Sequence, residues 1–176
     1  MVEFIPADIS IHRSILVEFN VEYLDWVLSE VQKRYDIDLT SVAEQTVQEY
    51  VENNIESLAT YRPREGSFYL LQEGEEFVGM GAIRKLNKDV CEIKRMYIRP
   101  EFRGKGFGKA LLQQLLAKGK EFGFSAVYLD TGLFMKAAQH IYRSAGFIER
   151  EQYPESEVPQ PIRRLWLYME KRLEKS

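Results

Sequence analysis

The sequence has few of the residues that build disulfide frameworks and metal sites. Its 176 residues include one cysteine, Cys91, and two histidines, His12 and His140. A single cysteine excludes an internal disulfide and is compatible with a reducing compartment. So few histidines and cysteines give no zinc-binding spacing, and we expect no bound metal.

Long apolar runs and an excess of positive charge are absent as well. No stretch approaches the ~20 apolar residues of a membrane span. The first residues, MVEFIP, include an early acid and lack the apolar core of a signal peptide. The net charge of −3 argues against general nucleic-acid binding, which favours a basic domain. We therefore expect a cytoplasmic protein that contacts neither membranes nor nucleic acid.

The residues that are present describe an ordinary globular chain. Its composition is 45% hydrophobic and 29% charged, and it contains no repeat, low-complexity tract or linker-like segment. A length of 176 residues is enough for one domain with a substantial core. We expect a single domain over residues 1–176.

Hydrophobic periodicity predicts a mixed α/β chain in the order β-α-α-β-β-β-α-β-α-β-β. A capping box formed by Ser41 and Glu44 marks the start of the second helix, and residues 73–76 give a hairpin turn. This order predicts a mixed α+β sheet with helices on its faces. The expected strands are 2–6, 67–72, 77–85, 90–98, 125–130, 147–152 and 164–170, and the expected helices are 10–33, 41–58, 110–122 and 135–144.

The segment RPEFRGKGFGK, residues 99–109, lies between an expected strand and an expected helix. Its glycines alternate at Gly104, Gly106 and Gly108, and residues 94–109 contain six cations and one acid. A glycine loop that leads into a helix directs free backbone N–H groups at an anion. The segment therefore predicts an anion-binding loop.

Two common phosphate-binding motifs do not fit this loop. A Walker A motif would need its first glycine at Arg103 and a hydroxyl residue at Ala110. In a dinucleotide-binding G-x-G-x-x-G motif, the third glycine would fall on Lys109 or on Leu111. Both interpretations are excluded.

The pattern Arg103-x-x-Gly106-x-Gly108, with MYIRPE before it and YRSAGF at residues 142–147, resembles the GNAT superfamily of N-acetyltransferases. The resemblance covers residues 68–147 and extends by element order to both ends. It implies a GNAT-like acyl-CoA N-acyltransferase fold, acetyl-CoA as acyl donor, and a loop that holds the pyrophosphate of coenzyme A. The cofactor-binding residues that it implies are Met96, Tyr97, Ile98, Arg103, Gly104, Lys105, Gly106, Phe107, Gly108 and Lys109.

The strand before the loop has an interrupted pattern. Its apolar residues Ile93 and Met96 are out of phase with a period of two, which indicates a β-bulge between them or a wobbling surface strand. In the resembled family, a splayed strand offers the main chain around Met96 and Ile98 to the pantetheine arm.

The resemblance also implies catalytic residues. Tyr142 matches the family's tyrosine acid, which protonates the departing thiolate; tyrosine is also a routine core residue, and the family position favours the acid. Glu92 matches a glutamate that some members use as general base, while others use a water chain or another group. At Met135 the family often has an asparagine that bonds the pantetheine arm, and methionine cannot replace that bond.

We expect an acetyl-CoA-dependent N-acetyltransferase in which an amine of a small molecule or peptide attacks the thioester directly. Cys91 has no histidine assigned beside it, which disfavours a covalent cysteine intermediate. A non-catalytic acyl-CoA-binding or regulatory module on the same fold is the alternative. The acceptor stays open among polyamines, amino acids, antibiotics and protein amines, as do a longer acyl group and assembly as a homodimer.

Overall fold

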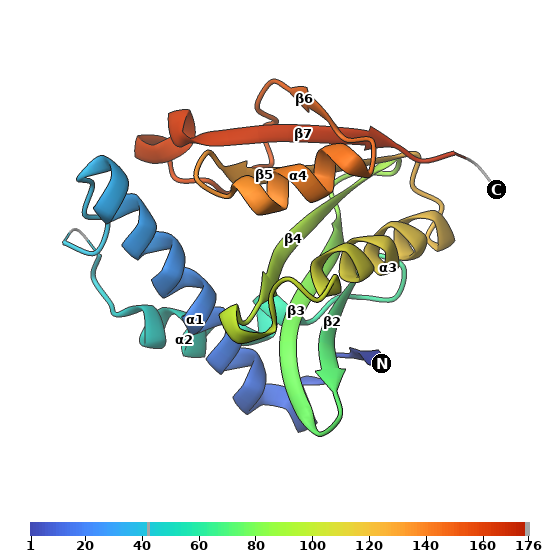
Figure 1. Cartoon of the computed structure of the whole chain (residues 1–176), viewed down its shortest axis with the longest axis horizontal. Coiled ribbons are helices and arrows are strands. Elements are labelled where there is room, and N and C mark those ends of the chain that lie inside the picture. Colours follow the sequence, from blue (N-terminus) through green and yellow to red (C-terminus); the bar gives the residue numbers. More distant parts are fainter. Residues whose placement is uncertain (42, 175–176) are drawn as a thin grey trace.

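A seven-stranded sheet with helices on both faces forms the computed structural model of the chain, which describes residues 1–41 and 43–174 (Figure 1). The element order confirms the predicted order, and the mixed α/β architecture confirms the predicted fold class. The strands are β1 (Val2–Pro6), β2 (Gly66–Glu73), β3 (Glu76–Lys85), β4 (Val90–Ile98), β5 (Ala126–Gly132), β6 (Ile148–Arg150) and β7 (Trp166–Arg172). The helices are α1 (Ile9–Tyr35), α2 (Val47–Ala59), α3 (Phe107–Glu121) and α4 (Lys136–Ser144).

The sheet has the order β1-β2-β3-β4-β5-β7-β6. β4 and β5 run parallel, and the other described neighbours are antiparallel. Helix α3 provides the crossover between the two parallel strands, as a parallel pair requires. The glycine loop predicted to bind an anion therefore lies between the end of β4 and the N-terminus of this crossover helix.

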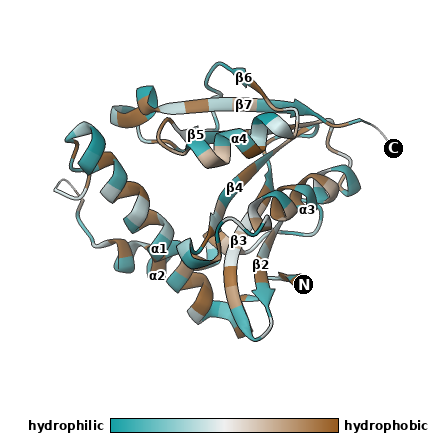
Figure 2. Cartoon of the chain, in the orientation of Figure 1, coloured by the Kyte–Doolittle hydropathy of each residue, from teal (hydrophilic) through white to brown (hydrophobic). Residues whose placement is uncertain are grey.

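Each face of the sheet has its own core. Successive strand residues point to opposite faces, so Leu70 packs with α1 and α2 while Leu71 packs with α3. Both side chains are fully buried. Figure 2 shows the matching pattern, with apolar segments along the inner strands and both polar and apolar residues on the helices. No helix in the described residues is long and apolar enough to cross a membrane.

The central strands separate part-way along their length. β4 and β5 pair at three positions, of which the last is Glu92 with Tyr128. Beyond this pair, β4 runs away from β5, and Figure 1 shows the widening gap. On the other edge of β4, Met80 faces Tyr97 and Ala82 faces Lys94, so one residue of β3 opposes two of β4. This irregularity confirms the β-bulge predicted between residues 93 and 96.

The second helix begins later than predicted. Helix α2 starts at Val47, and its capping box is made by Thr46 and Glu49 instead of Ser41 and Glu44. Both pairs fit the same sequence signature, and Ser41 instead bonds the carbonyl of Asp38 in a turn. The predicted box was wrong because a short-range motif does not say which of two matching sites begins the helix.

The last two strands also differ from their predicted bounds. β6 spans three residues, and β7 begins at Trp166. A 3-10 helix, Gln160–Leu165, occupies the predicted start of the last strand. Pro159 and Pro161 lie at its beginning, where a proline lacks the N–H that a sheet ladder needs.

The observed capping box predicts a stability difference between two similar substitutions. Thr46→Ala removes the hydroxyl that accepts from the Glu49 N–H and should lower the free energy of unfolding by about 0.5–2 kcal/mol. Ser41→Ala lies outside the helix and should change it by less than about 0.5 kcal/mol. Urea denaturation of both variants checks this, and an equal loss in the two would contradict the observed helix start.

Candidate active site

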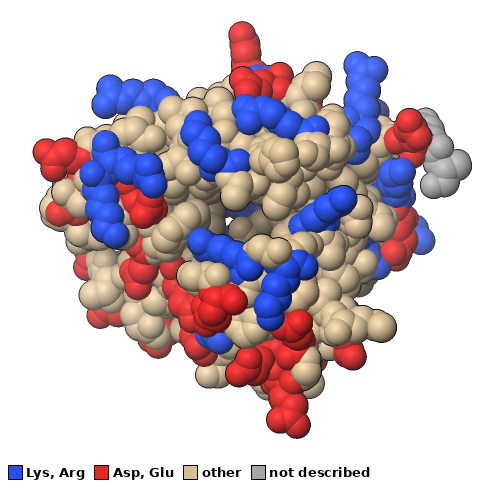
Figure 3. Space-filling model, viewed as in Figure 1, with Lys and Arg blue, Asp and Glu red and all other residues tan. Residues whose placement is uncertain are grey.

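A cavity of about 2060 Å³ opens where β4 and β5 separate. Its walls come from α1, the start of α2, β4, the glycine loop, α4 and residues 157–162. Figure 3 shows a hollow near the centre of the molecule's face, with Lys and Arg side chains around its mouth. Pockets for one small ligand measure roughly 300–1,000 Å³, so this cavity has room for two reactants.

The glycine loop forms one wall of the cavity. Gly104 and Gly106 have φ values of 79° and 85°, a region that non-glycine residues rarely adopt. A Cβ atom at either position would meet no atom of the described chain within 4 Å, because the space above the loop is open. Gly106 is the N-cap of α3 and supplies no side-chain cap, so the first N–H groups of the helix are free to bind an anion.

Gly108 plays a different part from its neighbours. It lies inside the first turn of α3, and its Cβ would contact Cδ1 of Ile141 at 3.3 Å. Its φ is not positive, so Gly108 does not adopt the left-handed backbone conformation that Gly104 and Gly106 adopt. Its small size instead lets α3 approach α4.

The loop cations do not all face the cavity. Arg103 lies on the wall, where its Nε donates to the carbonyl of Ile98 at 2.9 Å and its guanidinium stacks 5.3 Å from the Trp26 ring. Phe107 and Lys109 also line the wall. Lys105 lies outside it, with its Nζ 3.0 Å from a carboxylate oxygen of Glu73. The structure therefore separates Lys105 from the other predicted loop residues.

The separated part of β4 forms the second wall. Met96, Tyr97 and Ile98 all line the cavity, as predicted for residues beside the acyl donor. β5 pairs with β4 no further than Glu92, so the main-chain groups beyond that point on this edge do not bond β5. Free N–H and C=O groups on a strand edge can bond the amides of an extended ligand.

Tyr142 combines a core position with access to the cavity. It is 6% exposed, packs 5.9 Å from the Phe147 ring, and lies on the cavity wall. Its hydroxyl makes one weak contact, 3.8 Å from the sulfur of Met96. Burial raises its pKa, and the hydroxyl of Tyr23 and the carboxylate of Asp130 raise it further. At neutral pH, Tyr142 is a neutral O–H donor.

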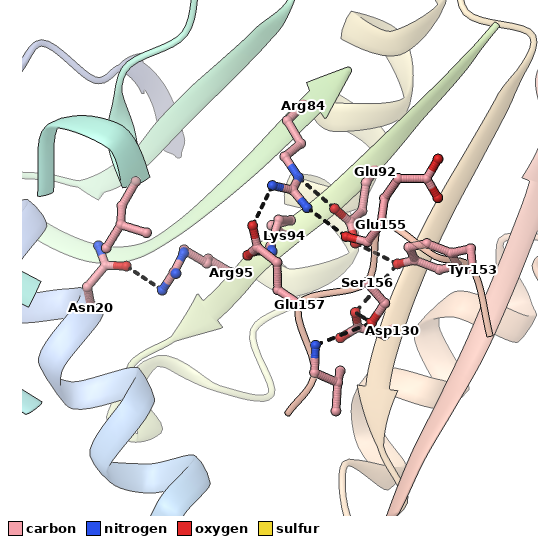
Figure 4. A network of polar contacts seen from close by, with 12 residues as sticks. Asn20, Arg84, Glu92, Lys94, Arg95, Asp130, Tyr153, Glu155, Ser156 and Glu157 are labelled. Carbon is pink, nitrogen blue, oxygen red and sulfur yellow. Dashed lines mark hydrogen bonds and ion pairs between the residues drawn. The ribbon is translucent and has the colours of Figure 1, made fainter. Parts of the chain in front are cut away.

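Glu92 is held away from the cavity. Its side chain is fully buried, with one carboxylate oxygen 2.7 Å from Nε of Arg84 and the other 2.6 Å from the hydroxyl of Tyr153 (Figure 4). It is not among the residues that line the cavity. The structure therefore separates this predicted base from the predicted acid, Tyr142.

Asp130 lies on the wall instead. It is two residues beyond Tyr128, where β5 has left β4, and it accepts a hydrogen bond from the Ser156 hydroxyl at 3.1 Å (Figure 4). The Tyr153 hydroxyl lies 3.5 Å from the same oxygen, and so between Asp130 and Glu92. Burial, followed by the charge of Glu92, raises the pKa of Asp130 to about 6.

Asp130 was not predicted from the sequence, although a signal for it existed. Val127 and Leu129 of β5 belong to the core on the α3 side, so Tyr128 and Asp130 must face the other side. A carboxylate among side chains of that buried face marks a candidate functional group. Its position relative to Tyr142 depended on the separation of β4 from β5.

Met135 occupies the N-cap of α4 on the cavity wall. Its sulfur lies 3.4 Å from the Gly132 N–H and 3.6 Å from the Thr131 hydroxyl. These are weak hydrogen bonds, and they direct the thioether toward its own chain. One turn later, Nε2 of Gln139 donates to the carbonyl of Gly132 at 2.7 Å.

Cys91 belongs to the core. It is fully buried among the residues packed beneath α3, and burial raises its pKa to about 12. A protonated thiol away from the cavity wall is a poor nucleophile.

Comparison with known proteins agrees with this geometry. The sequence profile of the acetyltransferase (GNAT) family matches residues 28–147. The chain belongs to the GNAT family. An uncharacterised N-acetyltransferase of Escherichia coli, YjgM, is 37% identical over 98 residues, which are 53% of this chain and 59% of that protein's length. An uncharacterised N-acetyltransferase of Schizosaccharomyces pombe is 26% identical over 160 residues, covering 89% and 93% of the two chains.

Solved structures share the GNAT fold over the whole chain. A GNAT acetyltransferase from Staphylococcus aureus has a TM-score of 0.69 at 22% identity, covering 99% of this chain and 100% of that one. PaiA N-acetyltransferase from Thermoplasma acidophilum, solved in complex with coenzyme A, has a TM-score of 0.68 at 17% identity, covering 98% and 99%. These comparisons confirm the resemblance and the fold class inferred from the glycine loop and the tyrosine motif.

The loop of this GNAT chain fits the pyrophosphate of coenzyme A. Any residue other than glycine at positions 104 and 106 would place its side chain in the open space above the loop. The N-terminus of α3 lies at this space. Arg103 and Lys109 lie on the wall beside this space. Backbone N–H groups, a helix N-terminus and two cations are together suited to a multiply charged anion.

A bulky residue in the loop should block this site. Gly106→Val would place a side chain in the open space and force a left-handed conformation on a β-branched residue. We expect no measurable coenzyme A binding by isothermal titration calorimetry. Arg103→Ala should weaken binding less, because it removes one cation and leaves the amides.

Gly74→Val is the matched control. Gly74 also has a positive φ, 64°, and open space at its Cβ, but it lies in the β2–β3 hairpin away from the cavity. It should carry a similar backbone cost and keep normal affinity. Unchanged affinity in a folded Gly106→Val protein would contradict the placement of the pyrophosphate.

Proposed function

We propose that this protein transfers the acetyl group of acetyl-CoA directly to an amine of a small molecule or peptide. The observation that carries the proposal is one cavity that is lined by the glycine loop, a neutral tyrosine O–H and a carboxylate with a raised pKa. Family membership supports the reaction, and PaiA with coenzyme A supports the donor. Residues 96–98, Arg103, Gly104, Gly106, Phe107, Gly108 and Lys109 are the proposed donor site, with the backbone of Lys105 as part of the loop.

The acceptor needs a group that takes its proton. An alkyl ammonium has a pKa near ~10.4, so it must lose a proton before its nitrogen can attack. We propose that Asp130 takes this proton, because it lies on the wall and is ionised above about pH 6. Glu92, the base expected from the sequence, supplies a buried negative charge that raises the pKa of Asp130.

The departing sulfur needs a proton in return. As the C–N bond forms and the C–S bond breaks, the thiolate gains a proton from the Tyr142 hydroxyl. A thiolate with a pKa near ~8.5 can accept a proton from a tyrosine that is reprotonated by solvent or product. Tyr142 has one weak intramolecular contact, so its O–H is free to turn toward the sulfur.

The burial of Cys91 supports direct transfer, because no thiol nucleophile was found on the wall among the described residues. A non-catalytic acyl-CoA-binding module remains the second candidate, on the ground that fold alone does not fix function. The raised pKa of Asp130 on the cavity wall favours the enzyme, since perturbed titratable groups cluster at catalytic sites.

We further propose a cytoplasmic location and a single domain. The continuous sheet that joins β1 to β7 supports one domain, and the buried free thiol of Cys91 is compatible with a reducing compartment. Assembly as a homodimer stays a prediction.

Tyr142→Phe separates catalysis from binding. The change keeps the ring and deletes the O–H, so kcat should fall by roughly 10²–10⁴-fold if this donor acts in the transition state. Affinity for acetyl-CoA should change little, because the ground-state thioester gains little from the hydroxyl. Steady-state kinetics with an accepted amine, beside a thermal melt, measures both.

A purely structural tyrosine would give the reverse pattern. The variant would then lose stability and keep kcat within about threefold of the wild-type value, well below the range of acid catalysis. A binding module would show no turnover in either protein.

The proton acceptor predicts a pH profile. Asp130 must be ionised to act, so kcat/KM should rise with pH through about 6. Asp130→Asn should remove this rise in kcat/KM with pH and lower kcat/KM by roughly 10²–10⁴-fold.

The same carboxylate predicts a pH-dependent stability. Because the pKa of Asp130 is raised in the folded protein, the wild-type fold loses stability as pH rises from 3.8 to about 6. Asp130→Asn should therefore melt no lower than wild type at pH 8.

Glu92→Gln tests the other carboxylate. Glu92 raises the pKa of Asp130, so the neutral glutamine should move the rise of kcat/KM to lower pH and leave measurable turnover. If Glu92 were the base, this rise would disappear in Glu92→Gln and persist in Asp130→Asn. That result would reverse the assignment.

A further inference from the structure

We call the part of the cavity that is lined by α1, the bulge of β4 and Asp130 the acceptor end. Besides the carboxylate of Asp130, it contains a cation, Arg95. Arg95 lies on the cavity wall, at the bulge of β4. The ion pairs of the described residues do not include it. A half-buried guanidinium without an acidic partner calls for an explanation, because desolvating a charge costs free energy.

The position of Arg95 is held by the fold. Its Nη1 donates to Oδ1 of Asn20 at 2.9 Å, and Figure 4 shows the side chain reaching from β4 toward α1. Asn20 is fully buried, and its Nδ2 donates to the Leu16 carbonyl at 2.8 Å, which fixes its oxygen toward Arg95. The guanidinium has five N–H donors, so most of them stay available to a ligand.

The backbone at Arg95 is strained as well. Its φ is 55°, in the left-handed region where a residue with a Cβ atom is disfavoured and glycine is not. Such strain persists where the surrounding structure imposes it, and it is common at ligand sites.

The neighbouring cations are already occupied. Lys94 pairs with Glu157, and Arg84 pairs with both Glu92 and Glu157. The remaining cations on the wall, Arg103, Lys109 and Lys136, belong to the loop and helices on the donor side. Arg95 is therefore the cation that the acceptor end offers.

Tyr23 lies near both charged groups, Asp130 and Arg95. Its pKa is raised to about 12, first by burial and then by Asp130, while Arg95 acts in the opposite direction. The tyrosine thus lies within the field of both groups, on the same cavity wall. A positive and a negative group that face one cavity are complementary to a zwitterion.

We propose that the acceptor is an amino acid, with its carboxylate bound by Arg95 and its amino group at Asp130. The inference rests on the proposed acetyl transfer and specifies its substrate class. Arginine suits this task because its planar fork can bond both oxygens of a carboxylate. A polyamine would place a second cation near Arg95 and would be repelled.

The test compares acceptors that differ in the carboxylate alone. Proteinogenic L-amino acids and their primary amides are assayed by thiol release from acetyl-CoA. For the best amino acid, wild-type kcat/KM should exceed that of its amide by roughly 10- to 100-fold, the range of charge-assisted hydrogen bonds. Arg95→Gln should remove this preference by lowering the value for the acid while leaving the amide within about twofold.

Two further variants separate the carboxylate site from a structural role. Arg95→Gly relieves the left-handed backbone but removes the donor to Oδ1 of buried Asn20, so the two effects on stability oppose each other. The variant should stay folded and still lose the preference for the acid. Arg13→Gln removes an exposed arginine of α1 that lies away from the cavity, and it should keep the preference. Wild-type protein that acetylates amides or spermidine as well as amino acids would overturn the proposal, as would an equal loss for acid and amide in Arg95→Gln.

A binding measurement separates this inference from the proposed function. N-acetylamino acids and their amides are titrated into the protein saturated with coenzyme A. Tighter binding of the acids that Arg95→Gln abolishes supports the carboxylate site, even if no acetyl transfer is found. If amines are acetylated but the acids bind no better than the amides, the amino-acid inference fails and acetyl transfer stands.

Discussion

The separation of β4 from β5 after the Glu92–Tyr128 pair is the constraint on which the rest of the site depends. Parallel strands that stayed paired would bury their shared edge in hydrogen bonds and leave no room for a ligand. The bulge at residues 95 and 96 turns the end of β4 away and increases its twist. The glycine loop follows directly after this end of β4, so the bulge lies beside both the cavity and the loop that we propose binds an anion.

Fully buried Glu92 and half-buried Asp130 both carry a desolvation cost in this fold. Glu92 is neutralised by Arg84 and a short hydrogen bond from Tyr153, whereas Asp130 has weaker support from Ser156 and faces the cavity. Burial, followed by the charge of Glu92, raises the pKa of Asp130 and makes it a stronger base. Of the two carboxylates, Asp130, whose pKa is raised, is therefore the one that lines the cavity.

Sequence reasoning succeeded where the signal is local and repeated along the chain. The element order, the hairpin at Gly74 and the bulge follow from hydrophobic spacing and glycine placement. It failed at the start of α2, where two capping motifs competed, and at β7, whose start is occupied by a proline-led 3-10 helix. In both places the outcome depended on packing that spacing alone does not describe.

The sequence alone predicts an anion-binding loop before α3 and a tyrosine, Tyr142, at a distance typical of the GNAT family, because both motifs are short and contiguous. Only the tertiary structure shows which carboxylate lines the cavity and which cation at its acceptor end makes no ion pair with the described residues. Asp130 and Arg95 lie 35 positions apart in the chain and on different strands. Both line one cavity because β4 separates from β5 and because neighbouring charges pair across the sheet. Short sequence patterns show neither of these two features.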